Sequence, residues 1–285
     1  MGTRFDMNGN IDIAWCAGCG NFAIHKIIKE SLEELDTDPQ QVVFSAGIGQ
    51  GAKMPQYINA HYFNGLHGRA LPIATAIKTA NPYLTVFAEG GDGDMYGEGG
   101  NHFIHTIRRN PAIVHFVHNN MIYGLTKGQG SPTTMRGQKT TLQPDGVYLE
   151  PFNPLAVAIS LKASFVARVF SGDIDQAKEV FKRAVKHKGY ALIDILHPCL
   201  SFNKVNTLKW FKENTYYIDE KHNPENAVEA FQKAMETEKL PLGIFYINNK
   251  ETVLHQEYNV YKKSDEPLFK RVVDENKLKK LLEKH

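Results

Sequence analysis

The stretch LTVFAEGGDGD at residues 84–94 decides how this chain is expected to fold. It joins a short apolar run, which predicts a buried strand, to a turn built from glycine and aspartate. The arrangement recurs at residues 112–120, AIVHFVHNN, where an apolar run ends in two asparagines. Two such strands separated by a helical segment predict parallel neighbours in one sheet, with both polar turns at its carboxyl edge.

Working outward, strand-like and helix-like segments continue to alternate. Apolar runs predict further strands at residues 41–45, 165–170 and 190–196. Helical spacing joins two sets of apolar residues, namely Phe22, Ile24, Ile27, Ile28 and Leu32, and then Ile174, Ala177, Val180, Phe181 and Ala184. This order predicts an α/β fold with a doubly wound, mainly parallel sheet.

The composition changes after Cys199. Residues 201–285 are richer in Lys, Glu, Asn and Tyr, with an apolar run at 242–247 and an amphipathic helix expected over 272–284. We therefore expect one α/β domain over residues 1–200, followed by an extension over residues 201–285 that packs on this domain or on a partner subunit.

The bulk composition argues against several classes of function. With 33 basic and 31 acidic residues the net charge is only +2, which gives no electrostatic reason to expect nucleic acid as a partner. The sequence shows neither a signal peptide nor an apolar run long enough to span a membrane, so we expect a cytoplasmic protein without membrane contact. Three cysteines are too few for a disulfide framework, and the pair Cys16 and Cys19 suggests a metal or redox role.

The two polar turns carry the residue types that hold a diphosphate through a divalent metal. Magnesium prefers oxygen ligands, and Asp92 offers a carboxylate while Asn120, 28 positions later, offers an amide oxygen. Gly91 and Gly93 would let the backbone turn sharply towards the phosphates, and a helix expected to start near Gly99 would direct free N–H groups at the anion. Each turn alone is ordinary loop composition, but together, each after an apolar strand, they favour a metal–diphosphate site.

This pair of turns resembles the signature of thiamine-diphosphate-binding proteins. The resemblance implies Mg²⁺ ligands at Asp92, at the side chain of Asn120 and at the main-chain carbonyl of Ile122. Five further segments resemble the β subunits of 2-oxoacid:ferredoxin oxidoreductases: WCAGCG at 15–20, LHGRA at 66–70, GNHF at 100–103, IYGLTKGQ at 122–129 and SPT at 131–133. The similarity covers about residues 10–200, and the early Cys-x-x-Cys is foreign to simple thiamine-dependent decarboxylases.

The resemblance implies roles for further residues. Those expected to line the thiamine diphosphate site are Ile48, Gly49, Gln50, Gly51, His67, Gly91, Gly93, Asp94, Gly124 and Leu125. His67, Leu125 and Lys53 are expected at the reacting centre, although His67 taken alone is an ordinary loop histidine. Lys53 would suit an acidic 2-oxoacid such as 2-oxoglutarate through a charge-assisted contact, and a solvated lysine explains it equally well.

The activity that the resemblance implies is oxidative decarboxylation of a 2-oxoacid, pyruvate or 2-oxoglutarate, to its acyl-CoA and carbon dioxide. The cofactor supplies the carbanion chemistry and the protein supplies position and electrostatics. The expected partners are an α subunit, ferredoxin, coenzyme A and the 2-oxoacid, in a heterotetramer of two α and two β chains. The carboxylate that activates the cofactor is expected from the α subunit, so neither Glu89 nor Glu98 is given that role.

The cysteines follow the family with one departure. Cys16, Cys19 and Cys199 match three of the four cysteines that hold a [4Fe–4S] cluster in this family, and Gln50 stands at the remaining position. A [4Fe–4S] cluster with a fourth ligand of another kind, or from the partner chain, is the first interpretation. A [3Fe–4S] cluster, no cluster, and a zinc site of the three cysteines with His197 are the alternatives.

Three other functions compete with this interpretation. A non-oxidative thiamine-dependent decarboxylase or carboligase would need no cluster. A non-catalytic subunit that has kept the fold would have no reason to hold the oxygen ligands of both Asp92 and Asn120. A Rossmann-type nucleotide-binding protein is the weakest alternative, because no G-x-G-x-x-G opens a helix after the first strand.

Overall fold

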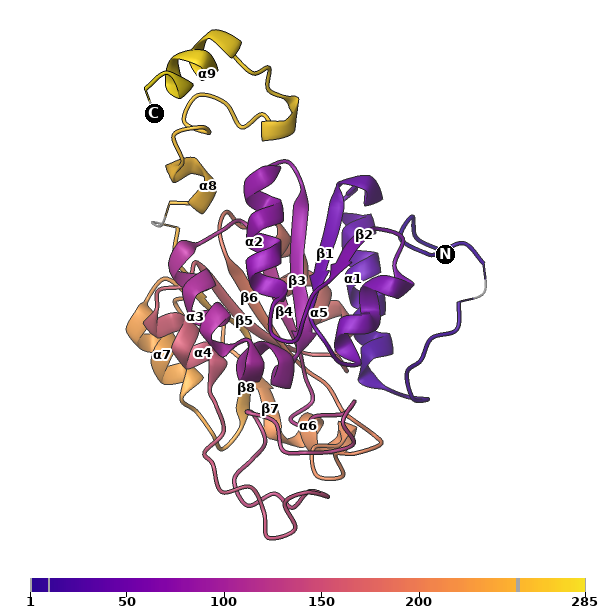
Figure 1. The fold of residues 1–285 in the computed structure, drawn as a ribbon. Helices are drawn as coiled ribbons and strands as arrows, with labels where there is room; N and C mark the ends of the chain where they lie inside the picture. Colours follow the sequence, from indigo (N-terminus) through magenta and orange to yellow (C-terminus); the bar gives the residue numbers. More distant parts are fainter. Residues whose placement is uncertain (1, 10, 250–251, 285) are drawn as a thin grey trace.

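The computed structural model describes residues 2–9, 11–249 and 252–284, and these contain one eight-stranded sheet (Figure 1). The strands are β1 (Val42–Ala46), β2 (His61–Asn64), β3 (Thr85–Gly91), β4 (Val114–Asn119), β5 (Phe165–Phe170), β6 (Ala191–Leu196), β7 (Thr215–Tyr217) and β8 (Leu240–Ile247). Their order is β2-β1-β3-β4-β6-β5-β8-β7, and only the β5–β8 pair is antiparallel among these neighbours. The mainly parallel sheet predicted from the sequence is confirmed.

Helices cover both faces of this sheet (Figure 1). They are α1 (Gly20–Glu34), α2 (Ala70–Ala80), α3 (Gly100–Arg109), α4 (Pro154–Ser160), α5 (Ile174–Lys186), α6 (Leu208–Asn214), α7 (Ala227–Ala234), α8 (Leu254–Glu257) and α9 (Glu275–Leu282). Short helical turns are η1 (Pro39–Gln41), η2 (Gly51–Tyr57), η3 (Gly93–Glu98) and η4 (Leu268–Lys270). Helices α1 and α5 pack together on one face, and α2, α3, α4 and α7 lie on the other, which is the doubly wound arrangement.

The central strands are largely apolar because both of their faces are buried. Successive side chains of a strand point to opposite faces. Phe44, Phe87 and Phe116 therefore pack towards α1 and α5, with the ring centroids of Phe44 and Phe87 4.9 Å apart. Val86 and Ala88, the neighbours of Phe87 along β3, pack towards α2 and α3. Two cores, one on each face, hold the strands in place.

The elements predicted from periodicity are confirmed with small shifts of their ends. The five predicted strands correspond to β1, β3, β4, β5 and β6, and the two apolar sets lie on α1 and α5. On α1, Phe22 is 39% exposed, whereas the other four residues of its set are buried. Strand β2 was not predicted, because it is an edge strand whose four residues are all exposed and which lacks an apolar run.

The C-terminal part adds to the same sheet. Strand β8 contains the predicted apolar run and pairs with β5, while α7 packs on α4 and β8. Further on, the hydroxyl of Tyr261 donates to the carbonyls of Thr79 (2.5 Å) and Ala80 (3.2 Å), at the end of α2. The predicted terminal helix appears as the shorter α9, which buries no residue and lies apart from the sheet (Figure 1). The division of the chain at residue 200 stays a prediction.

None of the helices in the described ranges is long and apolar enough to cross a membrane.

Candidate functional site

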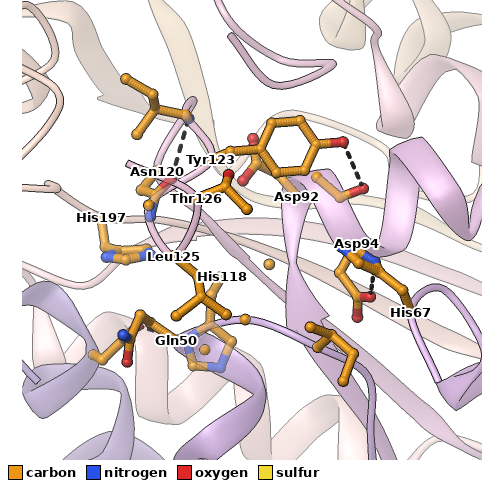
Figure 2. A pocket seen from close by; sticks show the side chains of 18 residues that line it. Gln50, His67, Asp92, Asp94, His118, Asn120, Tyr123, Leu125, Thr126 and His197 are labelled. Carbon is orange, nitrogen blue, oxygen red and sulfur yellow. Dashed lines mark hydrogen bonds and ion pairs between the residues drawn. The ribbon is translucent and has the colours of Figure 1, made fainter. Parts of the chain in front are cut away.

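A cavity opens at the carboxyl ends of β1, β3, β4 and β6 (Figure 2). It brings together the residues expected to line the cofactor or to bind the metal: Ile48, Gly49, Gln50, Gly51, His67, Gly91, Asp92, Gly93, Asp94, Asn120, Ile122, Gly124 and Leu125. These residues are distant in sequence, and they meet because the carboxyl ends of parallel strands share one edge of the sheet. Their roles stay predictions, but their common location is a finding.

Lys53 lies outside the lining of this cavity. It belongs to η2, two positions after Gly51, and its side chain is partly buried. Its ammonium group makes no ion pair with a carboxylate of any described residue. The carboxylates of Glu89 and Glu98 are also absent from the lining formed by the described residues. No glutamate of the described chain therefore faces the cavity.

Asp92 places a buried carboxylate at the site. The residue is 2% exposed, and the hydroxyls of Ser131 and Thr133 each donate to Oδ2 at 2.5 Å. Burial raises the pKa of Asp92 to about 6, and the two hydrogen bonds partly oppose this shift. The ionised form of a carboxylate in this environment is stabilised by any cation that can reach it.

The loop after β4 places Asn120 and Ile122, the other two residues expected to bind Mg²⁺ through oxygen atoms, in the lining of the same cavity. The side-chain oxygen of Asn120 accepts from the backbone N–H of Ile122 at 3.1 Å, and that of Asn119 accepts from the N–H of Met121 at 3.2 Å. Met121 has a φ of 57°, the left-handed region that non-glycine residues rarely adopt. These two hydrogen bonds close the tight turn in which Asn120 and Ile122 both reach the cavity (Figure 2).

The helix expected to start near Gly99 is α3, which begins at Gly100 with Gly99 as its N-cap. The π-helical turn η3, which begins at Gly93 just after Asp92, was not predicted. Neither Gly91 nor Gly93 adopts a positive φ. Gly93 is required for close packing instead, because a Cβ there would lie 2.1 Å from the ring of Tyr123, whereas at Gly91 the nearest atom is 3.9 Å away.

His67 is held by a buried carboxylate. Its Nδ1 lies 2.6 Å from Oδ1 of Asp94, and the same oxygen accepts from the N–H of Gly68 at 2.7 Å. Burial raises the pKa of Asp94, although these partners oppose the shift. The loop that carries His67 is thus fixed to the start of η3, on the side of the cavity opposite Asn120 (Figure 2).

The three cysteines and Gln50 line a second cavity beside the first. The two cavities share Asn21, Gln50, Asn120 and Gly124 in their linings. Burial raises the pKa of Cys19, and the charges of Cys199 and Cys16 add to the shift, so the three thiols are near one another. The indole N–H of Trp15 donates to the main-chain carbonyl of Gln50 at 2.8 Å. The side-chain oxygen of Gln50 has no hydrogen-bond partner among the described residues.

The zinc alternative requires the three cysteines and His197 to surround one ion. Among the described residues, no group of three or more His, Cys, Asp or Glu side chains could hold one metal ion. The arrangement therefore gives the zinc hypothesis no support. Thiolates of an iron–sulfur cluster bind different iron atoms and stand further apart than ligands of one ion.

Comparison with known proteins decides the family. Residues 42–195 match the family described as thiamine pyrophosphate enzyme, C-terminal TPP binding domain, and residues 199–263 match the family described as the C terminal of the pyruvate ferredoxin oxidoreductase beta subunit. The 2-oxoacid:ferredoxin oxidoreductase subunit beta of Sulfolobus sp is 39% identical over 284 residues, covering 95% of this chain and 91% of that protein. This chain belongs to the family of 2-oxoacid:ferredoxin oxidoreductase β subunits. It is thus one subunit of an oxidoreductase and contains a thiamine-pyrophosphate-enzyme domain.

Two further proteins support the assignment of this chain to the family. The 2-oxoacid:ferredoxin oxidoreductase subunit beta of Saccharolobus solfataricus is 43% identical over 248 residues, covering 82% of this chain and 81% of the relative. The structure of 2-oxoglutarate:ferredoxin oxidoreductase from Magnetococcus marinus with 2-oxoglutarate, coenzyme A and succinyl-CoA bound superimposes with a TM-score of 0.89 at 33% identity. That superposition covers 97% of this chain and 94% of the other.

Sequence reasoning missed several residues of the cavity. Asn21, His118, Tyr123, Thr126 and His197 also line it. His118 shares a hydrogen bond of 2.9 Å with the side-chain oxygen of Asn21. Burial lowers the pKa of His118 well below its usual value and that of His197 to about 4, so both imidazoles are neutral at neutral pH. Both follow apolar residues at strand ends, the same signal that singled out Asp92 and Asn120.

We expect Gly93→Ala to destabilise the protein, because the added Cβ would overlap the Tyr123 ring. Overpacking of this kind costs about 1–3 kcal/mol. Thermal unfolding should therefore occur at a lower temperature than in the wild type. Gly100→Ala is the control, since a Cβ there meets nothing within 4 Å, and it should be neutral. Equal unfolding temperatures for all three proteins would show that the ring moves aside without cost.

Proposed function

We propose that this chain binds thiamine diphosphate through Mg²⁺ and, together with an α subunit, oxidatively decarboxylates a 2-oxoacid to its acyl-CoA, with electrons passed to ferredoxin. The observation that carries the proposal is the convergence of Asp92, Asn120 and Ile122 on one cavity. A carboxylate, an amide oxygen and a main-chain carbonyl leave positions of an octahedral shell for phosphate oxygens. Membership of the oxidoreductase family supports the same reaction.

The residues around Asp92 fit the metal role. Both hydroxyl donors, Ser131 and Thr133, bind Oδ2 of Asp92. The other oxygen accepts no side-chain hydrogen bond from the described residues, so it is available to a cation. Burial makes that carboxylate costly to ionise without a positive partner, and a divalent cation would supply one. The fit therefore rests on the donor set and on its electrostatics.

The other lining residues position the reactants. Thiamine diphosphate, when bound, supplies the nucleophilic carbon and the electron sink for decarboxylation. His67, oriented by Asp94, and Leu125, which is 43% exposed, are proposed to flank the reacting centre. His118 and His197 offer hydrogen-bonding groups without adding charge, because burial keeps both neutral. The backbone around Gly51 and Gly93 completes the proposed cofactor wall.

A [4Fe–4S] cluster is proposed for the second cavity, with Cys16, Cys19 and Cys199 as its thiolate ligands. Soft sulfur ligands suit iron–sulfur clusters. Gln50 lines the same cavity, and its buried side-chain oxygen has no hydrogen-bond partner among the described residues, so it is proposed as the fourth ligand. Because the two cavities share Asn120 and other residues, a cluster here would lie beside the cofactor and could accept its electrons directly.

A partner chain is needed to complete the proposed reaction. The aminopyrimidine of the cofactor requires a carboxylate, and no glutamate of the described residues lines the cavity. We propose that the α subunit supplies it, in a heterotetramer of two α and two β chains. Residues 1–200 would form the cofactor domain and residues 201–285 an extension of it. Coenzyme A is proposed as the acyl acceptor, since the Magnetococcus marinus structure holds coenzyme A and succinyl-CoA.

Metal binding through Asp92 predicts that Asp92→Asn loses Mg²⁺ and thiamine diphosphate while the fold remains. The asparagine side chain can still accept hydrogen bonds from Ser131 and Thr133, so the core around it is kept. Asp92→Ala should lose both groups too, with a lower unfolding temperature. Cofactor content of the purified complex, measured by mass spectrometry, decides the matter. Asp145→Ala, on an exposed loop, is the control and should retain both. Full occupancy in Asp92→Asn would remove the metal assignment.

Iron content tests the proposed cluster. The anaerobically purified complex should contain about four irons for this cavity, with matching acid-labile sulfide and a reducible paramagnetic signal. Cys199→Ala should lose them, whereas Gln50→Cys should keep them. The same complex should reduce a viologen only when both a 2-oxoacid and coenzyme A are present. Absence of iron from this chain together with decarboxylation that reduces no acceptor would favour the non-oxidative decarboxylase instead.

We propose 2-oxoglutarate as the substrate, with Lys53 binding its distal carboxylate. A charge-assisted contact contributes about 1.5–3 kcal/mol, so Lys53→Ala should lower kcat/KM for 2-oxoglutarate about tenfold or more and leave pyruvate little affected. Lys188→Ala is the matched control, because that exposed lysine precedes β6 and so lies at the opposite edge of the sheet. Equal losses with the two substrates would mean that Lys53 does not bind the distal carboxylate.

A further inference from the structure

A buried ion pair lies beneath the cavity and is not part of its lining. Nε of Arg168 on β5 is 2.9 Å from Oδ2 of Asp194 on β6, and these residues are 6% and 0% exposed. The other oxygen of Asp194 accepts from the hydroxyl of Tyr96 at 3.1 Å and from the amide of Asn119 at 3.0 Å. A buried ion pair contributes little net stability compared with apolar packing. The ion pair is better suited to positioning the side chains around it.

The carboxylate of Asp194 fixes which way the Asn119 amide points. A carboxylate only accepts hydrogen bonds, so the NH₂ group of Asn119 must face Asp194. The amide oxygen is then turned to the other side. There it accepts from the N–H of Met121 at 3.2 Å, and the hydroxyl of Thr133 lies within hydrogen-bonding distance at 2.9 Å. The opposite orientation would set the amide oxygen against the carboxylate and lose the bond from the Met121 N–H.

The oriented amide holds the turn that carries two proposed metal ligands. Met121 lies in the left-handed region with a φ of 57°, a conformation that costs energy for a residue with a side chain. The bond from its N–H to Asn119 and the bond from the hydroxyl of Thr134 to its carbonyl, at 2.7 Å, stabilise that conformation. Asn120 precedes Met121 and Ile122 follows it, so the direction of both donors depends on this turn.

The Asn119 amide is also linked through Thr133 to Asp92, the third proposed metal ligand. The Thr133 hydroxyl has one proton and two acceptors within reach, Oδ2 of Asp92 at 2.5 Å and Oδ1 of Asn119 at 2.9 Å. It therefore lies between the end of β3 and the end of β4. Sharing of this one proton links the Thr133 side chain to Asn119 on one side and to the Asp92 carboxylate on the other.

We propose that Asp194 is a positioning residue for all three proposed magnesium ligands. Anchored by Arg168, its carboxylate sets the Asn119 amide, and that amide supports both the turn with two of the ligands and the hydroxyl bound to the third. Asp194 is not among the residues of the cavity wall. Apart from the through-space repulsion that helps to raise the pKa of Asp92, it acts on the ligands through Asn119. The inference rests on the proposed metal role of Asp92.

Asp194→Asn in the assembled complex tests this role with little change of volume. We expect Mg²⁺ affinity, titrated on metal-free complex in the presence of thiamine diphosphate, to fall about 10–100-fold, as is usual when a partner of a metal ligand is removed. Excess Mg²⁺ should restore cofactor retention. Tyr96→Phe is the matched control: it removes another hydrogen bond from the same carboxylate without touching Asn119. Its Mg²⁺ affinity should equal that of the wild type.

Unchanged Mg²⁺ affinity in Asp194→Asn, with only a lower unfolding temperature, would overturn the positioning role. If that variant does not fold, Asn119→Ala takes its place, with the same loss of affinity expected and the same unchanged affinity as the contrary result. Failure of the proposed function has a different signature, namely a wild-type complex without Mg²⁺-dependent cofactor binding. A wild type that binds, an Asp92→Asn that does not, and an Asp194→Asn like the wild type would refute the positioning role alone.

Discussion

The hydrogen bonds that Ser131 and Thr133 donate to the Asp92 carboxylate tie the end of β3 to the chain that follows β4. A buried carboxylate is tolerated only where donors or a cation compensate for the water it has lost. Here the donors approach Oδ2 of Asp92 from the protein, and the cavity lies on the remaining side. Much of the site can be understood as an arrangement that keeps this charge in place and accessible.

The sheet makes that arrangement possible. Its parallel strands release their polar ends at one edge, while the two apolar cores on either face fix where each end lies. One layer deeper, polar side chains interrupt the apolar interior, as Arg168 and Asp194 do on β5 and β6. The site thus consists of an outer set of donors facing the cavity and an inner set that orients them.

Local patterns predicted a large part of this. Apolar runs followed by Asp92 and by Asn120 located two strand ends and the side chains beyond them, and the structure brings both to one cavity with Gly51 and His67. The prediction was less accurate where local composition is ambiguous. Glycine after a strand suits a turn or a helical segment equally well, so the π-helical turn η3 was not predicted. The edge strand β2 carries no buried face and therefore no periodic signal.

The amino-acid sequence by itself determined the class of fold, the succession of the buried strands along the chain and the residue types at their carboxyl ends, because these follow from spacing along the chain. Only the tertiary structure decided which distant groups bind one another. Thr133 with Asp92 and Asn119 with Asp194 are examples. Such pairs depend on how neighbouring strands are ordered and on the register between them, and no periodicity within a single segment encodes either.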